Sequence, residues 1–329
     1  MLQAVIDIGS NSIRLVIYKV EKSKDIKILM NKKELAGLAA YIRNGLMTDD
    51  GISKACQVLD EFKHLLDNFK ITKIAAFATA ALRNIKNSDN AIKQIEEKTN
   101  LNIHLLSGTE EATLGFIGAT KELGNSNGLL LDIGGASTEI VVYKNSIIEQ
   151  AISLPIGSLN AAKLFVENIL PTKNERKTIK ETVLVELSKY PELTSKKYEN
   201  ICGIGGTIRA TCKINKYLFN LPVDCLNVKT PNIKKMIKLL ENDSTDNSIS
   251  TESLQILLKT VPDRIETILP GMIILHTLTK HFKAENLILS TSGVREGYLY
   301  NYILGTTERK SVTDNNSVEV DSNEERSNA

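Results

Sequence analysis

A fourteen-residue segment near the start of the chain is repeated 125 residues later, and this repeat limits the folds that the chain can adopt. Residues 6–19, IDIGSNSIRLVIYK, align without gaps with residues 131–144, LDIGGASTEIVVYK, and seven of the fourteen positions are identical. In each copy, β-branched residues flank a small polar centre, which predicts a strand, a tight glycine-containing turn and a second strand. Two copies of one supersecondary unit predict two related lobes.

Strand and helix patterns alternate after each copy of the repeat. Residues 52–69 carry apolar side chains at helical spacing, residues 74–79 have the character of a buried strand, and residues 173–190 form a charged helical stretch. The sequence SGTE at residues 107–110 fits a capping box, which predicts a helix running to about residue 122. Alternating elements of this kind predict an α/β fold, with the two related lobes enclosing a cleft.

The clearest linker is the sequence GNSNG at residues 124–128. We therefore expect an N-terminal lobe at residues 1–124 and a C-terminal lobe at residues 125–310, whose last helix is free to pack back on the first lobe. Residues 311–329 lack apolar periodicity and are expected to form a disordered acidic tail.

The net charge of +2 is unevenly distributed: the tail carries −4 and the rest of the chain +6. A mildly basic body suits an anionic substrate, although scattered surface lysines would give the same charge.

Composition excludes several classes of protein. Hydrophobic residues make up 42% and charged residues 24% of the chain, which excludes a chain disordered throughout and a collagen-like repeat. The longest apolar run, about residues 74–82, is far shorter than the ~20 residues of a membrane span, and the N-terminus reads as a strand rather than a signal peptide. The four cysteines and four histidines show no metal-binding spacing, so neither a zinc site nor a disulfide scaffold is expected. Together these features predict a cytoplasmic protein without a membrane partner.

Three glycine-containing turns are candidates for binding an anion. The repeated turns, DIGSNS at residues 7–12 and DIGGAS at residues 132–137, allow backbone N–H groups to converge on an anion, and the aspartate before each turn could hold Mg²⁺. A third turn, CGIGGT at residues 202–207, follows a strand-like run and precedes a helix-like run, which is typical of a phosphate loop at a helix N-terminus. It lacks the lysine of a Walker A motif. Any one of these turns alone could be purely structural.

Single charged residues are less informative than the turns. Glu110 and Glu111 lie in the first turn of a predicted helix, where they could stabilise the helix dipole or orient and deprotonate a water molecule. Glu139 could complete a metal site or be a solvated strand residue. Arg14 and Arg83 are candidate phosphate clamps, although an arginine is more often a surface residue. For Arg264 and Arg295, too, a surface position is the more frequent one.

Seven motifs in the same order resemble those of the exopolyphosphatase/guanosine pentaphosphate phosphohydrolase (Ppx/GppA) family. They are AVIDIGSNSIRLVIY, FATAALRN, LSGTEEATLGFIGA, LLLDIGGASTEIVV, SLPIGSLN, GIGGTIRA and SGVREGYLY, and they cover about residues 1–305. The resemblance implies two actin/hexokinase/Hsp70-like (ribonuclease H-like) lobes in the short, two-domain form of the family. One departure is Ala136, which stands where the family usually has the third glycine of DIGGGSTE.

The resemblance also implies roles for individual residues. It implies hydrolysis of a terminal phosphoanhydride by water with Mg²⁺, other divalent cations being alternatives. Glu111 matches the general base, and Asp132 and Glu139 match metal-associated acids. The implied phosphate-binding residues are Ser10, Asn11, Ser12, Arg14, Arg83, Gly134, Gly135, Ser137, Gly205, Gly206, Thr207 and Arg264.

The sequence leaves several functions open. The first is an exopolyphosphatase that releases phosphate from the ends of inorganic polyphosphate. The second is a phosphatase of guanosine pentaphosphate (pppGpp) in the stringent response. A catalytically weak polyphosphate or alarmone sensor, or a nucleotide-binding regulator or ATPase of the actin-like superfamily, is the alternative outside this enzyme class. The sequence itself does not show the oligomeric state; the resemblance implies a homodimer, and no nucleic-acid partner is expected.

Overall fold

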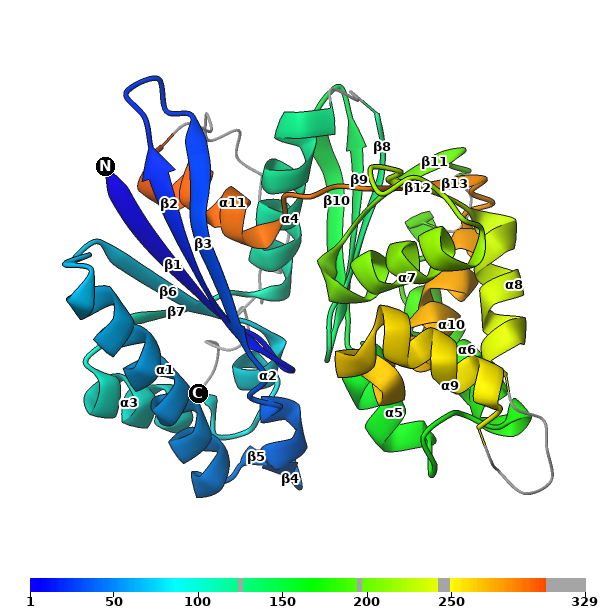
Figure 1. The fold of residues 1–329 in the computed structure, drawn as a ribbon, viewed down its shortest axis with the longest axis horizontal. Helices are drawn as coiled ribbons and strands as arrows, with labels where there is room; N and C mark the ends of the chain where they lie inside the picture. Colours follow the sequence, from blue (N-terminus) through cyan, green and yellow to red (C-terminus); the bar gives the residue numbers. More distant parts are fainter. Residues whose placement is uncertain (124–126, 194–196, 242–248, 306–329) are drawn as a thin grey trace, which may run out of the picture.

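Two β-sheets with the same order of strands form the two halves of the protein (Figure 1). The structure, a computed structural model, describes residues 1–123, 127–193, 197–241 and 249–305. The first sheet has the order β3-β2-β1-β6-β7, with β1 (Leu2–Ile8), β2 (Ile13–Val20), β3 (Ile26–Glu34), β6 (Ile74–Ala78) and β7 (Ile103–Leu105). The second has the order β10-β9-β8-β11-β13-β12, with β8 (Gly128–Ile133), β9 (Thr138–Lys144), β10 (Ile147–Leu154), β11 (Asn200–Ile204), β12 (Asn227–Lys229) and β13 (Asn286–Leu289).

The pairing pattern of the first sheet recurs in the second. In both sheets the first two pairings are antiparallel and the next two are parallel, and β12 adds an antiparallel strand at the edge of the second sheet. The repeated segments form the β1–β2 and β8–β9 hairpins. Their turns close alike: the Gly9 N–H donates to Ser12 O at 3.2 Å, and the Gly134 N–H donates to Ser137 O at 3.0 Å. The sequence repeat therefore encodes the same turn geometry twice.

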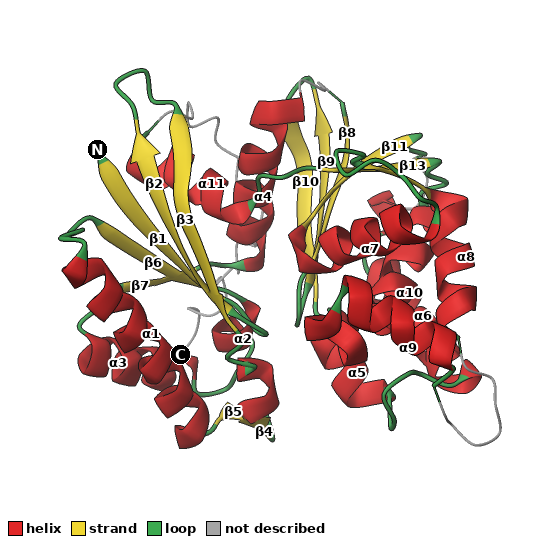
Figure 2. Ribbon diagram, viewed as in Figure 1, coloured by secondary structure: helices red, strands yellow, loops and turns green. Residues whose placement is uncertain are grey.

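Helices cover both faces of each sheet (Figure 2). The helices α1 (Asp49–Asn68), α2 (Ala80–Arg83) and α3 (Ser88–Thr99) belong to the first half, and α5 (Ser158–Phe165), α6 (Lys173–Ser188), α7 (Gly205–Leu218), α8 (Thr230–Leu240), α9 (Thr251–Thr260) and α10 (Ile265–His281) belong to the second. A short strand pair, β4 (Ile42–Arg43) and β5 (Leu46–Met47), precedes α1. The largest core lies between the second sheet and its helices, where α10 buries most of its residues.

Two helices, α4 (Gly108–Leu123) and α11 (Val294–Tyr298), fill the space between the sheets (Figure 1). Phe116 of α4 packs on the second sheet and Leu114 of the same helix packs on the first. Tyr298 of α11 also packs on the first sheet, stacked on Phe77 with ring centroids 4.8 Å apart. The two helices touch through glycine: a Cβ on Gly297 would lie 1.8 Å from the carbonyl oxygen of Leu114. The C-terminal segment therefore returns to the N-terminal sheet.

The structure confirms the predicted α/β fold with two related lobes. The predicted helices and strands of the first half match α1, β6 and α4. The predicted capping box of α4 is present: the Glu110 N–H donates to Ser107 Oγ at 3.1 Å, and the Ser107 N–H donates to Glu110 Oε2 at 2.9 Å. The lobe boundaries stay a prediction. The predicted tail at residues 311–329 and part of the linker, residues 124–126, lie outside the described residues. In the described part of the chain, we find no helix that has both the length and the apolar character to span a bilayer.

Candidate active site

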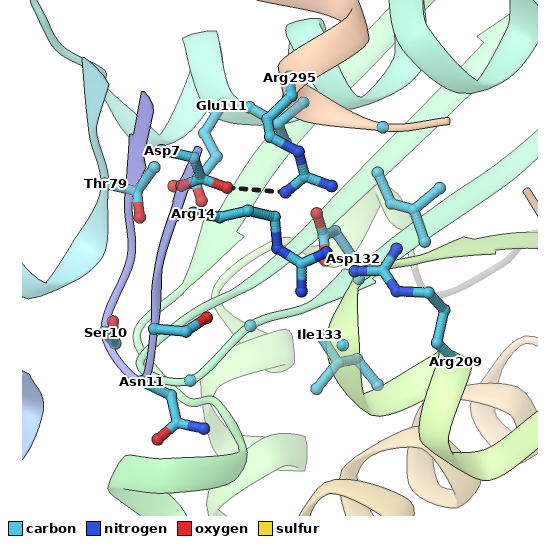
Figure 3. A pocket seen from close by; sticks show the side chains of 18 of the residues that line it. Asp7, Ser10, Asn11, Arg14, Thr79, Glu111, Asp132, Ile133, Arg209 and Arg295 are labelled. Atoms are coloured by element: carbon cyan, nitrogen blue, oxygen red, sulfur yellow. Dashed lines mark hydrogen bonds and ion pairs between the residues drawn. The ribbon is translucent and has the colours of Figure 1, made fainter. Parts of the chain in front are cut away.

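The two repeated turns face each other across a pocket between the sheets, which we call the central pocket (Figure 3). A Cβ on Gly135 of the second turn would lie 3.0 Å from the Cβ of Ser10 in the first. The pocket is also lined by the start of α7, by the start of α11 and by Thr79 after β6. The carboxyl ends of the central strands of both sheets thus meet at one place, which is where ligands commonly bind in α/β proteins.

Most of the residues predicted from the sequence line the central pocket. They are Ser10, Asn11, Ser12, Arg14, Glu111, Asp132, Gly134, Gly135, Gly205, Gly206 and Arg264. The other four lie outside its lining: Arg83, Ser137, Thr207 and Glu139. Ser137 is buried and its carbonyl oxygen closes the second turn, while the buried hydroxyl of Thr207 has no hydrogen-bond partner among the described residues.

The start of α7 forms one wall of the central pocket. Gly205 has a φ of +87°, and a Cβ at this position would lie 2.0 Å from Oδ1 of Asp132, so both the backbone conformation and the space require glycine. In the part of the chain that the structure describes, no side chain caps the N-terminus of α7. The first N–H groups of a helix lack intrahelical acceptors and carry partial positive charge. This wall is therefore suited to an anion.

Four arginines also line the central pocket: Arg14, Arg209, Arg264 and Arg295. Arg264 lies over the start of α7, with Nη2 2.3 Å from where a Cβ on Gly206 would be. Burial and the positive charges of Arg295, Arg14 and Arg264 together lower the pKa of Arg209 to about 10, against the raising effect of Asp132. The four guanidinium groups repel one another, Asp7 and Asp132 offset part of this repulsion, and a bound anion would offset more of it. The arrangement indicates a polyanionic ligand.

Arg209, Arg295 and Thr79 are pocket residues that were not assigned to the site from the sequence, and Asp7 was considered there only as the aspartate before the first turn that could hold Mg²⁺. Arg209 lies within the GIGGTIRA motif and Arg295 within the SGVREGYLY motif, and these motifs are the sequence signal that could have identified both as site residues. Arg295 Nη1 donates to Asp7 Oδ2 at 3.0 Å, so residues from the two ends of the chain form one ion pair in the pocket. Only the return of α11 to the first sheet creates this pair.

Glu111 lies in the first turn of α4, and its carboxylate reaches the central pocket (Figure 3). Arg83 Nη1 donates to Glu111 Oε2 at 2.7 Å and to the carbonyl oxygen of Leu106 at 3.0 Å. Burial, with a smaller contribution from the charges of Asp132 and Asp7, raises the pKa of Glu111 to about 7 against the lowering effect of Arg83. A buried carboxylate that titrates near neutral pH is suited to accept a proton from water.

Glu139 lies next to Arg83 of the Arg83–Glu111 pair, outside the lining of the central pocket. Its side chain is 1% exposed and accepts a hydrogen bond from the Ser153 hydroxyl at 2.7 Å, and Arg83 Nη2 is 3.9 Å from its Oε1. Burial raises the pKa of Glu139 well above its usual range, and Glu111 and Asp132 add to this effect. The guanidinium of Arg83 thus lies between two carboxylates, outside the pocket lining, although phosphate binding was predicted for it.

The acids of the central pocket fit a hard divalent cation that is shared with a ligand. Asp132 and Asp7 supply oxygen donors, and burial raises the pKa of Asp132 to about 6, with Arg209 lowering it and Asp7 raising it. Within the described ranges, no group of three or more histidine, cysteine, aspartate or glutamate side chains is arranged to hold a metal. Mg²⁺ is usually held by one or two carboxylates together with substrate phosphates, and this sparse donor set matches that pattern.

Comparison with known proteins agrees with this geometry. The chain matches the profile of the Ppx/GppA phosphatase family over residues 15–305. It is 29% identical over 305 residues to a bifunctional 3-dehydroquinate synthase/phosphatase of Fusobacterium nucleatum (88% of this chain, 45% of that protein). It is 26% identical over 313 residues to a guanosine-5′-triphosphate,3′-diphosphate pyrophosphatase of Pseudoalteromonas atlantica (91% and 58%) and 23% identical over 327 residues to exopolyphosphatase 1 of Mycobacterium tuberculosis (97% and 93%).

The first two of these relatives are much longer than this chain, which spans about half of their length. Among solved structures, the Aquifex aeolicus member of the Ppx/GppA family superposes with a TM-score of 0.73 at 28% identity, covering 94% of this chain and 99% of that one. The likeness extends over both sheets, and the two-lobed, actin-like architecture implied by the sequence is thereby confirmed.

Proposed function

Because the chain belongs to the Ppx/GppA phosphatase family, we propose that it hydrolyses the terminal phosphoanhydride bond of inorganic polyphosphate. One observation carries the proposal. A single pocket holds four arginines, the uncapped start of a helix and a buried carboxylate whose pKa is raised to about 7. The cationic groups suit a chain of phosphates, and the carboxylate suits the activation of water. The relative named exopolyphosphatase supports the same substrate.

Substrate binding would use the groups that converge on the central pocket. The backbone of the two turns and the start of α7 would donate N–H groups to phosphate oxygens, together with the arginines. Asp132 and Asp7 would hold Mg²⁺, which when bound supplies further positive charge to the phosphates. Phosphoryl transfer depends mainly on positioning and charge neutralisation, and these groups provide both.

Glu111 would act as the general base. Its carboxylate accepts a proton from the attacking water as the new P–O bond forms at the terminal phosphorus. The anhydride P–O bond breaks, and the shortened chain leaves with the electron pair. Arg83 holds the carboxylate in place through the 2.7 Å hydrogen bond. Glu139 was predicted to ligate the metal; since it lies outside the pocket lining, we propose instead that it supports Arg83 from behind.

A second candidate is the removal of the terminal phosphate of pppGpp. It is favoured by the relative from Pseudoalteromonas atlantica, whose name specifies this nucleotide. Both substrates present the same terminal phosphoanhydride, so the same groups would act on each.

The four cysteines carry no disulfide, which agrees with the proposed cytoplasmic location. A homodimer belongs to the proposal as well, and light scattering of the purified chain would test it.

The deciding experiment measures phosphate release from long-chain polyphosphate and from pppGpp side by side, with Mg²⁺. Faster release from polyphosphate supports the first proposal, and faster release from pppGpp supports the second. If the chain binds either compound tightly but releases no phosphate, a sensor is the better description. If it neither binds nor hydrolyses them, the proposal is wrong.

A further inference from the structure

A buried chain of hydrogen bonds leads from the core of the first sheet to the central pocket. We propose that Tyr18 and Glu296 are positioning residues that hold Arg295 in place, and that Arg295 is one of the groups that bind the phosphate chain. The inference rests on the proposed binding of a polyanion in the central pocket, and it adds residues that no motif assignment gave a role.

Tyr18 and Glu296 fix the first turn of α11. The Tyr18 hydroxyl, on β2, donates to Glu296 Oε1 at 2.6 Å, and the Gly293 N–H donates to Glu296 Oε2 at 2.8 Å. Tyr18 is fully buried and Glu296 is 4% exposed. Burial and the neighbouring Glu296 raise the pKa of Tyr18, so its hydroxyl stays protonated and keeps donating. Both carboxylate oxygens of Glu296 are therefore held, one by the Tyr18 hydroxyl of the sheet and the other by the Gly293 N–H at the start of the helix.

Arg295 is the sequence neighbour of this anchor. It precedes Glu296 in the sequence, and its guanidinium lies between Asp7 and Asp132 (Figure 3). Nη1 donates to Asp7 at 3.0 Å, while the buried Nε has no acceptor among the described residues. The charges of Asp7 and Glu296 raise the pKa of Arg295 against the effect of burial, so it remains a cation. A fixed cation with unused donors at the pocket wall is suited to bind phosphate oxygens.

The anchor matters because it bonds the first turn of α11 to the first sheet. The other contacts of this short helix, Val294–Tyr298, are packing contacts: Tyr298 stacks on Phe77 at its end, and Val294 and Gly297 pack against α4. Without the Tyr18 hydroxyl, one oxygen of the buried Glu296 would lose its partner, and the residues next to it would be free to shift. A displacement of about 1 Å of a binding group is enough to weaken its contribution strongly.

The internal repeat supplies a matched control. Tyr143 on β9 is the repeat equivalent of Tyr18, but its ring packs on Phe116 of α4, with centroids 4.9 Å apart, and no acid among the described residues corresponds to Glu296. Both tyrosines are buried. Tyr18→Phe and Tyr143→Phe therefore remove the same hydroxyl from equivalent strands, and only the first change affects the anchor of Arg295.

The test measures binding of a non-hydrolysable triphosphate analogue with methylene bridges, by titration calorimetry on the full chain. We expect Tyr18→Phe to weaken binding about tenfold, in line with the loss of a hydrogen bond to a charged group, and Tyr143→Phe to change it less than about twofold. Equal affinities of the two variants would overturn the inference. Failure of the unmodified chain to bind the analogue would count against the proposed function instead.

A double-mutant cycle separates positioning from a general loss of stability. If Tyr18 acts through Arg295, the Tyr18→Phe/Arg295→Met double variant binds no more weakly than Arg295→Met alone. Additive losses would overturn the inference. Glu296→Gln, which keeps the shape of the side chain, serves as the second probe of the anchor if Tyr18→Phe does not fold. It is expected to weaken binding at least as much as Tyr18→Phe, and binding at full strength would refute the proposal.

Discussion

Replacing Glu111 by glutamine tests the chemistry of the central pocket most directly. The side chain is 12% exposed and bonded to Arg83 at 2.7 Å, and glutamine has the same shape and can still accept this hydrogen bond. It has no carboxylate to accept a proton from water. A positioned general base contributes about 10²–10⁴-fold to the rate. We therefore expect kcat for phosphate release to fall by that factor, while the affinity for the methylene triphosphate analogue stays within about threefold of the parent.

The parent enzyme should also show the titration of Glu111. Burial raises the pKa of this carboxyl from 4.5 to about 7, so the reactive carboxylate is the minor form in mildly acidic buffer. Activity is then present above that pKa and lost as the pH falls through it. A single group with this pKa predicts that kcat/KM rises about tenfold between pH 6 and pH 8. The residual activity of Glu111→Gln should be flat over the same range.

The adjacent Glu110 provides the control. Its carboxylate accepts from the Ser107 N–H at 2.9 Å in the capping box of α4, and glutamine preserves such a box. Glu110→Gln should keep activity within about twofold of the parent with an unchanged pH profile. The reasoning would be refuted if Glu111→Gln kept more than about a tenth of the parental rate, or if the parental kcat/KM were flat between pH 6 and pH 8.

Three further predictions follow from the geometry. Gly205→Ala, with φ +87° and a Cβ 2.0 Å from Asp132, should lower the free energy of unfolding by about 1–3 kcal/mol and weaken binding of the triphosphate analogue; calorimetry of both would show it. Gly297→Ala, whose Cβ would meet the Leu114 carbonyl oxygen at 1.8 Å, should destabilise the protein by about 3 kcal/mol or more in urea titrations, and a neutral effect would contradict the α4–α11 contact. Chelation with EDTA should abolish phosphate release and Mg²⁺ should restore it, whereas release that persists in EDTA would exclude the shared-cation arrangement of Asp132 and Asp7.

The repeat allowed much of the fold to be predicted from the sequence. Two matching segments with a polar centre specify two hairpins, and these carry both turns of the central pocket. The order of the remaining strands could not be predicted in the same way, because β6, β7, β11 and β13 have short apolar runs that fit several positions in a sheet. Their places depend on packing between segments far apart in the chain, which local patterns do not specify.

The arginines show why the site was less predictable than the fold. Arg83 and Arg295 both lie within short motifs, and a motif specifies the residue type but not its partner. In the structure, Arg83 is bonded to Glu111 behind the pocket wall, whereas Arg295 reaches the pocket because the last helix crosses to the first sheet. The resemblance implies phosphate binding for Arg83, whereas for Arg295 the sequence indicated only a surface position as the more frequent alternative. Whether an arginine holds a carboxylate or a phosphate depends on tertiary contacts that a motif does not specify, and the phosphate-binding role of Arg83 stays a prediction.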